Sequence, residues 1–234
     1  MLVPARRHDP EWMDRTGNTK SQLEGALRDI GAVNRYLGGS RAALHAIAPF
    51  LAACPEGGTL HLLDVGTGGG DVPAALASAA RKQGKRLAIV GIDRDPVTAA
   101  HAHRETAGNP DVDIVRADAF ATGFATGSFD LVLASMFLHH FAHAEAVALV
   151  REFRRIATQA VIVNDLERHL LPWAFIAIGA RLTRRDPMFV HDAPLSVLRG
   201  FTKHELHRVA VDAGASGATV TEAWPYRLVL TVPA

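Results

Sequence analysis

The sequence predicts an α/β domain built on a mostly parallel sheet with helices on both faces. Three observations support this fold class. Short apolar segments alternate with amphipathic helical segments along most of the chain, which is typical of a parallel sheet covered by helices. A glycine-rich stretch, residues 66–70, follows the first apolar segment. The last two apolar segments are close enough in sequence to pair antiparallel.

Two helices are expected before the first strand. Residues 22–37 place leucine, isoleucine and valine on one helical face, and Ser40 can cap a second helix. We therefore expect residues 1–58 to form an N-terminal helical cap and residues 59–234 to form the main domain.

Seven strands and four further helices are expected after the cap, and the last two strands form the antiparallel pair. Residues 166–201 do not fit the alternation, and we expect them to form an insert that covers the substrate. The expected strands are residues 60–64, 87–92, 112–115, 131–134, 160–163, 218–222 and 227–232, and the expected helices are residues 72–82, 96–106, 145–157 and 202–214.

Composition excludes several classes of partner. The 25 lysines and arginines nearly balance the 24 acids, so there is no clustered basic excess for nucleic acid. The single cysteine, Cys54, excludes an internal disulfide and a multi-cysteine zinc site. The first 18 residues are polar, without a secretory signal, and no apolar run approaches the roughly 20 residues that cross a bilayer. The expectation is a cytoplasmic protein without stable membrane insertion.

The glycine-rich stretch and two acids mark a ligand site. Gly66, Gly68 and Gly70 stand between the first strand and its helix, where open α/β sheets bind ligands and where glycine lets a backbone approach a ligand closely. Asp93 ends the second strand and can accept hydrogen bonds from both ribose hydroxyls. Asp118 follows the third strand on the same rim.

Asp71 indicates which ligand the loop accepts. The dinucleotide fingerprint requires glycine at this position, but here a carboxylate lies near the expected pyrophosphate. Charge repulsion disfavours a pyrophosphate there, whereas a sulfonium cofactor carries a positive charge and no phosphate.

Four segments together resemble the class I S-adenosylmethionine-dependent methyltransferases: residues 62–70, 90–93, 116–119 and 128–132. The resemblance runs from about Leu60 to the C-terminus. It implies a Rossmann-like, seven-stranded fold and S-adenosylmethionine as the cofactor.

The same resemblance implies a role for each part of the cofactor site. The glycine loop, residues 66–70, would hold the amino-acid end of the cofactor. Asp93 would bind its ribose and Asp118 its adenine amino group, and Ser135 or Met136 would line the channel through which the methyl group passes. The expected cofactor-binding residues are Asp64, Gly66, Thr67, Gly68, Gly70, Asp93, Arg94, Asp118, Ala119 and Ser135.

Two further segments, residues 33–39 and 164–168, are similar to bacterial methyltransferases that accompany type III polyketide synthases. This narrower resemblance implies secondary metabolism and a small phenolic or polyketide-derived hydroxyl acceptor. C-methylation of an aromatic or quinone acceptor is the alternative reaction, and a non-catalytic S-adenosylmethionine-binding protein is the alternative class.

The acceptor side offers several candidate residues. His139 and His140 follow the fourth strand. One of them can remove the acceptor's proton as a general base, or both can simply shape the pocket. Position alone favours His139 as the base. Asp165 can orient a histidine or cap a helix. His191 can close over the substrate or belong to a surface loop, and Met136 is expected beside the substrate.

No metal is expected. No acid follows the fourth strand directly, and Asp165 alone is too little for a hard cation. The apolar residues of the insert suit either an acceptor pocket or a dimer interface, so a homodimer is compatible with the sequence.

Overall fold

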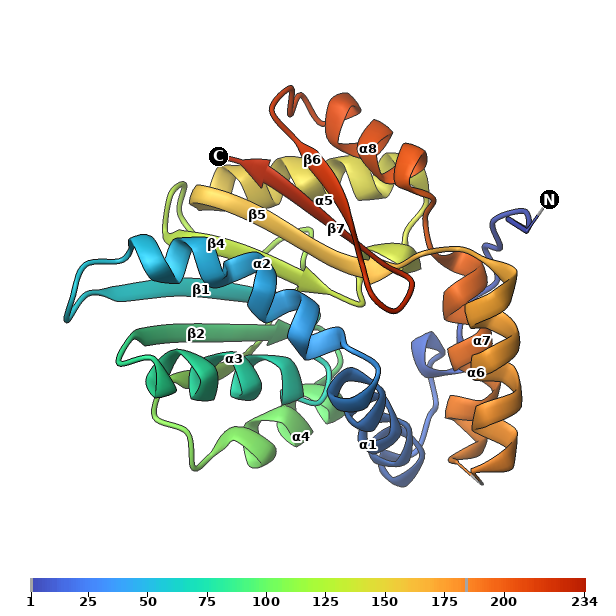
Figure 1. The fold of residues 1–234 in the computed structure, drawn as a ribbon. Helices are drawn as coiled ribbons and strands as arrows, with labels where there is room; N and C mark the ends of the chain where they lie inside the picture. The colour runs from blue at the N-terminus through green and yellow to red at the C-terminus, as the bar shows by residue number, and fades with distance from the viewer. Residues whose placement is uncertain (1, 184) are drawn as a thin grey trace.

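The computed structural model describes residues 2–183 and 185–234. It shows a seven-stranded sheet in the order β3-β2-β1-β4-β5-β7-β6 (Figure 1). Strands β1 to β5 are parallel, and β7 runs antiparallel between β5 and β6, so the predicted mixed sheet is confirmed. The strands are β1 Thr59–Val65, β2 Arg86–Asp93, β3 Val112–Arg116, β4 Phe129–Ser135, β5 Ala157–Leu166, β6 Thr219–Ala223 and β7 Arg227–Pro233.

Helices cover both faces of the sheet because successive side chains of a strand point to opposite faces. Leu62 of β1 packs in the apolar core with α2 and α3, whereas its neighbour Leu63 packs in the core with α5 and α8. Helix α4 lies beside α3 (Figure 1). The helices are α1 Lys20–Tyr36, α2 Gly39–Ala53, α3 Asp71–Lys82, α4 Pro96–Thr106, α5 His143–Ile156, α6 Leu170–Leu182, α7 Pro187–Arg199 and α8 Lys203–Asp212, with short 3₁₀ helices η1 Trp12–Asp14 and η2 Leu138–His140.

Two parts of the chain lie beyond the carboxyl ends of the parallel strands. Helix α1 and the N-terminal segment, defined as residues 2–18, form one part, and the insert forms the other as helices α6 and α7 (Figure 1). The backbone N–H of Arg7 donates to the carbonyl of Leu198 at 3.0 Å, which ties the N-terminal segment to α7. These parts enclose the edge of the sheet where the sequence places its candidate residues.

Helix α2 differs from α1 in its surroundings. Its buried residues Ala43, Ile47 and Leu51 belong to the core on one face of the sheet.

Among the described residues, no helix combines the length and apolar character that crossing a membrane requires.

Candidate functional site

A cavity of about 1140 Å³ opens at the carboxyl ends of β1, β2 and β4. Pockets for a single small molecule span about 300–1000 Å³, so this cavity is at least as large as the pocket that one such ligand needs. It is lined by the glycine loop, the ends of β2 and β3, the N-terminal segment, α1 and α7, and Leu27 of α1 lies close to Gly68 and Gly69 of the loop. The apolar face of α1, including Leu23, Leu27, Ile30 and Val33, lines the cavity.

The glycine loop has a backbone that requires glycine. Gly66 has a φ of 69°, and a Cβ on this residue would lie 2.2 Å from the Phe137 ring. The N–H groups of Gly66 and Thr67 both donate to the carbonyl of Ile92 at 2.9 Å, which fixes the loop against β2. These contacts hold the loop against the end of β2.

Buried carboxylates surround this loop. Burial raises the pKa of Asp64 to about 7, against the hydrogen bond from Thr67, whose hydroxyl donates to Asp64 Oδ2 at 2.8 Å. Burial also raises the pKa of Asp71 and Asp93. Asp71 Oδ2 is buried without a hydrogen-bond partner. Such a group of desolvated acids favours a cationic ligand and disfavours a phosphate.

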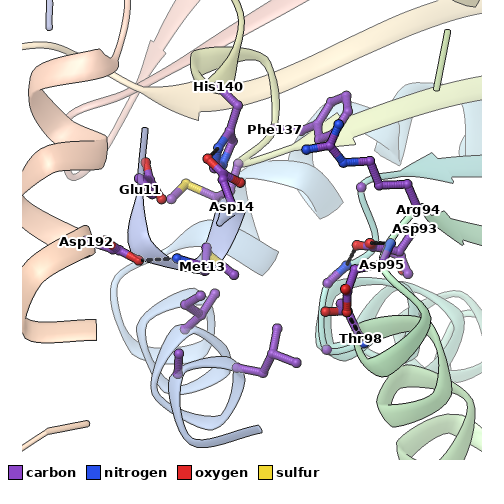
Figure 2. A pocket seen from close by; sticks show the side chains of 18 of the residues that line it. Glu11, Met13, Asp14, Asp93, Arg94, Asp95, Thr98, Phe137, His140 and Asp192 are labelled. Carbon is purple, nitrogen blue, oxygen red and sulfur yellow. Dashed lines mark hydrogen bonds and ion pairs between the residues drawn. The ribbon is translucent and has the colours of Figure 1, made fainter. Parts of the chain in front are cut away.

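Asp93 lies at the end of β2 and is tied to the loop. Its Oδ2 accepts from the N–H of Gly68 at 3.3 Å, and its Oδ1 accepts from the N–H of Asp95 at 3.0 Å. Figure 2 shows Asp93 and Arg94 on the opposite side of the cavity from His140.

The structure brings most of the predicted site residues to this cavity. Three of them, Gly70, Asp165 and His191, do not line it. The residues that do are Asp64, Gly66, Thr67, Gly68, Asp93, Arg94, Asp118, Ala119, Ser135, Met136, His139 and His140.

His191 lies on a helix, not on a loop. Its ring stacks on Trp12 with centroids 4.0 Å apart, and its Nδ1 is 2.7 Å from Asp192 Oδ1. The neighbouring Asp192 lines the cavity instead. This placement gives no support to the expected contact between His191 and a substrate.

His139 is enclosed by carboxylates. Its Nδ1 lies 2.6 Å from Asp165 Oδ1 and its Nε2 lies 3.6 Å from Glu11 Oε1, and only 2% of the residue is exposed. Burial alone lowers the pKa of His139, but the attraction of Asp165 and Glu11 outweighs it and raises this pKa to about 9. His139 therefore carries a proton at neutral pH.

His140 has a different environment. Its side chain is 18% exposed, and its Nδ1 lies 3.0 Å from Asp14 Oδ2. The two histidine rings are 4.3 Å apart between centroids. Figure 2 shows Asp14 reaching His140 from the N-terminal segment, with Glu11 beside them. His140 therefore faces the cavity while one nitrogen is held by a carboxylate.

Sequence reasoning missed Glu11, Met13 and Asp14, which all line the cavity. These residues belong to a polar segment without helical or strand periodicity, so pattern analysis did not assign them a place. The signal that could have found them is Trp12-Met13, two large apolar residues between two acids in an otherwise polar stretch.

One group of side chains could hold a metal ion. Glu11, His139 and His140 each offer a ligand atom, and these atoms lie within 4.8 Å of one another. A fixed cation already lies against this group: Arg199 Nε is 3.9 Å from Glu11 Oε1, and Arg199 Nη1 is 3.6 Å from Asp14 Oδ2.

The raised pKa of His139 predicts a pH-dependent stability. The folded state binds this proton more tightly than the unfolded chain, with a pKa of about 9 against 6.5. The contribution of this proton to the free energy of unfolding is complete below pH 6.5 and is lost as the pH rises to 9. Its full size is on the order of 3 kcal/mol. Denaturant unfolding at pH 6, 7.5 and 9 should show this loss for the wild type and not for His139→Asn. Parallel curves for the two proteins would contradict the assignment.

Comparisons with known proteins agree with this geometry. Residues 62–159 match a family model described as a methyltransferase domain. A comparison with curated proteins gives no significant match.

Several solved structures share the fold. A candidate O-methyltransferase from Nostoc punctiforme PCC 73102 is 19% identical with a TM-score of 0.63, over 91% of this chain and 60% of that one. Magnesium protoporphyrin IX methyltransferase (ChlM) from Synechocystis PCC 6803, with bound SAH, is 15% identical with a TM-score of 0.57, over 94% of this chain and 90% of that one. The CurJ carbon methyltransferase is 13% identical with a TM-score of 0.63, over 95% of this chain and 62% of that one.

This chain thus spans less than two thirds of the Nostoc protein and of CurJ. The shared feature is the sheet with its antiparallel final pair and its flanking helices. Residues 62–159 therefore resemble a methyltransferase domain, and the chain has the seven-stranded fold of the class I methyltransferases.

Proposed function

We propose that this protein is an S-adenosylmethionine-dependent methyltransferase that methylates a hydroxyl group of a small phenolic or polyketide-derived acceptor. The observation that carries the proposal is one continuous cavity, lined by the glycine loop and Asp93 at one end and by His140 at the other. In this proposal the N-terminal segment and α1 form the cap within residues 1–58, whereas α2 packs on the sheet, and residues 166–201 cover the acceptor.

The cofactor half suits a cation. The glycine loop holds the amino-acid end, Asp93 accepts from the ribose hydroxyls, Asp118 accepts from the adenine amino group, and Ser135 and Met136 lie near the methyl group. The buried acids of the loop support a positively charged cofactor. When bound, S-adenosylmethionine supplies an electrophilic methyl group and a positive charge.

The acceptor half supplies a base. A phenol with a pKa of about 10 must lose its proton before or during attack. The transfer forms a bond between the acceptor oxygen and the methyl carbon, breaks the sulfur–carbon bond and leaves a neutral thioether. The acceptor's proton goes to His140, whose ring lies in the cavity. Holding the two reactants in line is the other contribution of the protein.

His139 is the weaker candidate for this base. Its two ring nitrogens face Asp165 and Glu11, and the raised pKa means that it already holds a proton. We assign it a structural role, with Asp165 holding its ring. This choice departs from the preference for His139 that position in the sequence suggests.

Treatment with a chelator is expected to leave turnover unchanged. Arg199 already lies against both Glu11 and Asp14, and protonated His139 lies against Glu11, so cationic groups already contact these two carboxylates. The measurement is turnover after dialysis against EDTA, with and without added Mg²⁺ or Zn²⁺. A loss of activity that a divalent ion restores would show that the histidine cluster holds a metal.

The function is tested by incubating the protein with methyl-labelled S-adenosylmethionine and a panel of phenolic, quinone and polyketide acceptors. Mass spectrometry should find a labelled O-methyl product. The CurJ similarity makes C-methylation the second candidate reaction, and fragmentation that places the label on carbon would select it. Cofactor binding without any labelled product would favour a non-catalytic binding protein.

A further inference from the structure

We infer that two carboxylates position the proposed base: Asp14 of the N-terminal segment positions the His140 ring, and Asp192 on α7 positions Asp14 by holding the backbone of Trp12 and Met13. The inference rests on the proposed role of His140 as the proton acceptor. It adds two positioning residues from opposite ends of the chain.

The contact between Asp14 and His140 selects one tautomer of the ring. Asp14 Oδ2 lies 3.0 Å from His140 Nδ1, and an ionised carboxylate can only accept a hydrogen bond. Nδ1 therefore carries the proton in this pair, which leaves Nε2 of the neutral ring without one. An unprotonated Nε2 is the form that can take the acceptor's proton.

The short helix that carries Asp14 is held in place by a second carboxylate, that of Asp192. The 3₁₀ helix η1 has only 3 residues, too few to hold its own position. The N–H groups of Trp12 and Met13 donate to Asp192 Oδ1 and Oδ2 at 2.8 and 3.0 Å. Asp192 is only 4% exposed. Asn18 Nδ2 adds hydrogen bonds to the carbonyls of Trp12 and Arg15 at 2.8 and 2.9 Å.

Figure 2 shows this chain of contacts, from Asp192 to Met13 on one side and from Asp14 to His140 on the other. Asp192 therefore fixes the short helix that carries Asp14, although no hydrogen bond joins Asp192 to His140 among the described residues.

The charges around His140 support the pairing. Glu11, Asp14 and Asp165 are the carboxylates around the two histidine rings, and His139 and Arg199 are the cations in contact with them. Arg199 Nη2 also donates to the carbonyl of His140 at 2.6 Å. The proton that His140 receives in the proposed reaction is stabilised by Asp14, which is the carboxylate in contact with that ring.

The test is the tautomer of His140, read from ring ¹⁵N chemical shifts of the full chain labelled at histidine. The spectra are recorded without cofactor, and the His140 signal is assigned with His140→Gln. The wild type should show Nδ1–H. Asp14→Ala should change the tautomer and lower kcat by about 100-fold, with the KM of the cofactor unchanged. Asp14→Asn keeps an acceptor for Nδ1–H, so it should keep the tautomer and recover part of kcat.

Asp192→Ala should change the His140 signals in the same direction as Asp14→Ala. Asp192→Asn keeps one carbonyl oxygen for the segment and should give a smaller change, which protects the test if the alanine variant fails to fold. Asp9→Ala is the matched control, because Asp9 is an exposed acid of the same segment that pairs with Arg7 at 2.7 Å; it should leave the signals and kcat unchanged.

An Nε2–H tautomer in the wild type, or unchanged signals in Asp14→Ala, would overturn the role of Asp14. Unchanged His140 signals in both Asp192 variants would overturn the role of Asp192. Because these spectra need no cofactor, they are independent of the proposed reaction. Failure of the wild type to bind S-adenosylmethionine would overturn the proposed function instead.

Discussion

Replacing His140 with glutamine is expected to lower kcat by about 10²- to 10⁴-fold, the usual contribution of a general base. The affinity for S-adenosylmethionine should stay unchanged, because His140 lies on the acceptor side of the cavity and the cofactor residues lie on the other. Turnover of an accepted phenol and calorimetric titration with the cofactor measure the two effects separately.

His143→Gln is the matched control. This histidine also pairs with a carboxylate, at 2.8 Å from Asp212, but its side chain is 45% exposed. The control should keep wild-type turnover. If His140→Gln and His139→Gln both retain full turnover, neither imidazole is the base.

Replacing Asp93 with alanine is expected to weaken the binding of S-adenosylmethionine by about 100-fold or more. The carboxylate would lose two hydrogen bonds to ribose hydroxyls, each worth about 1.5–3 kcal/mol when one partner is charged, and about 3 kcal/mol corresponds to about 100-fold in Kd. Calorimetry with S-adenosylmethionine and with S-adenosylhomocysteine measures the effect, and both ligands should lose affinity because both carry the ribose.

Asp113→Ala tests whether the loss is specific. Asp113 lies on the neighbouring strand β3 and is exposed, so its removal should leave the Kd unchanged. Unchanged affinity of Asp93→Ala for S-adenosylmethionine would contradict the proposal that Asp93 binds the ribose of the cofactor. Asp93→Asn keeps a carbonyl oxygen for the N–H of Gly68, so comparing it with the alanine variant separates loss of the ribose contacts from loosening of the loop.

The cofactor half of the cavity could be predicted from sequence because its signals are local. Gly66 and Gly68 closely follow strand β1 and have positive φ angles. Asp93 stands at the carboxyl end of β2, and the topology of a parallel sheet alone places this end at the ligand-binding edge. Parallel strands with their connections bring such residues together whatever the details of side-chain packing. Gly70, by contrast, belongs to the pattern but does not line the cavity.

The acceptor half could not be predicted in the same way. His139 and His140 are adjacent in sequence and both line the cavity, yet His139 is buried between Asp165 and Glu11 whereas the side chain of His140 is 18% exposed. Which of two neighbours is buried depends on the segments that pack against them. Here that segment is the N-terminal one, whose Asp14 meets His140 across a separation of 126 residues.

Helix α1 shows the same limit. Its apolar face is plain in the sequence, but a periodic face only indicates that a helix packs against something. In the structure Leu27, Ile30 and Val33 line the cavity, so the same pattern that predicts a core helix here forms a wall of the site.

The sequence by itself determined the mixed sheet and the glycine loop, because alternating periodicity and glycine at a strand end act over a few residues. The sequence also placed Asp93 at the carboxyl edge of that sheet. Only the tertiary structure decided that Asp14 reaches His140 and that His139 is sealed between two carboxylates. Those pairings depend on long-range packing of a segment without periodicity, and burial, which sets the charge of each histidine, exists only once that packing is complete.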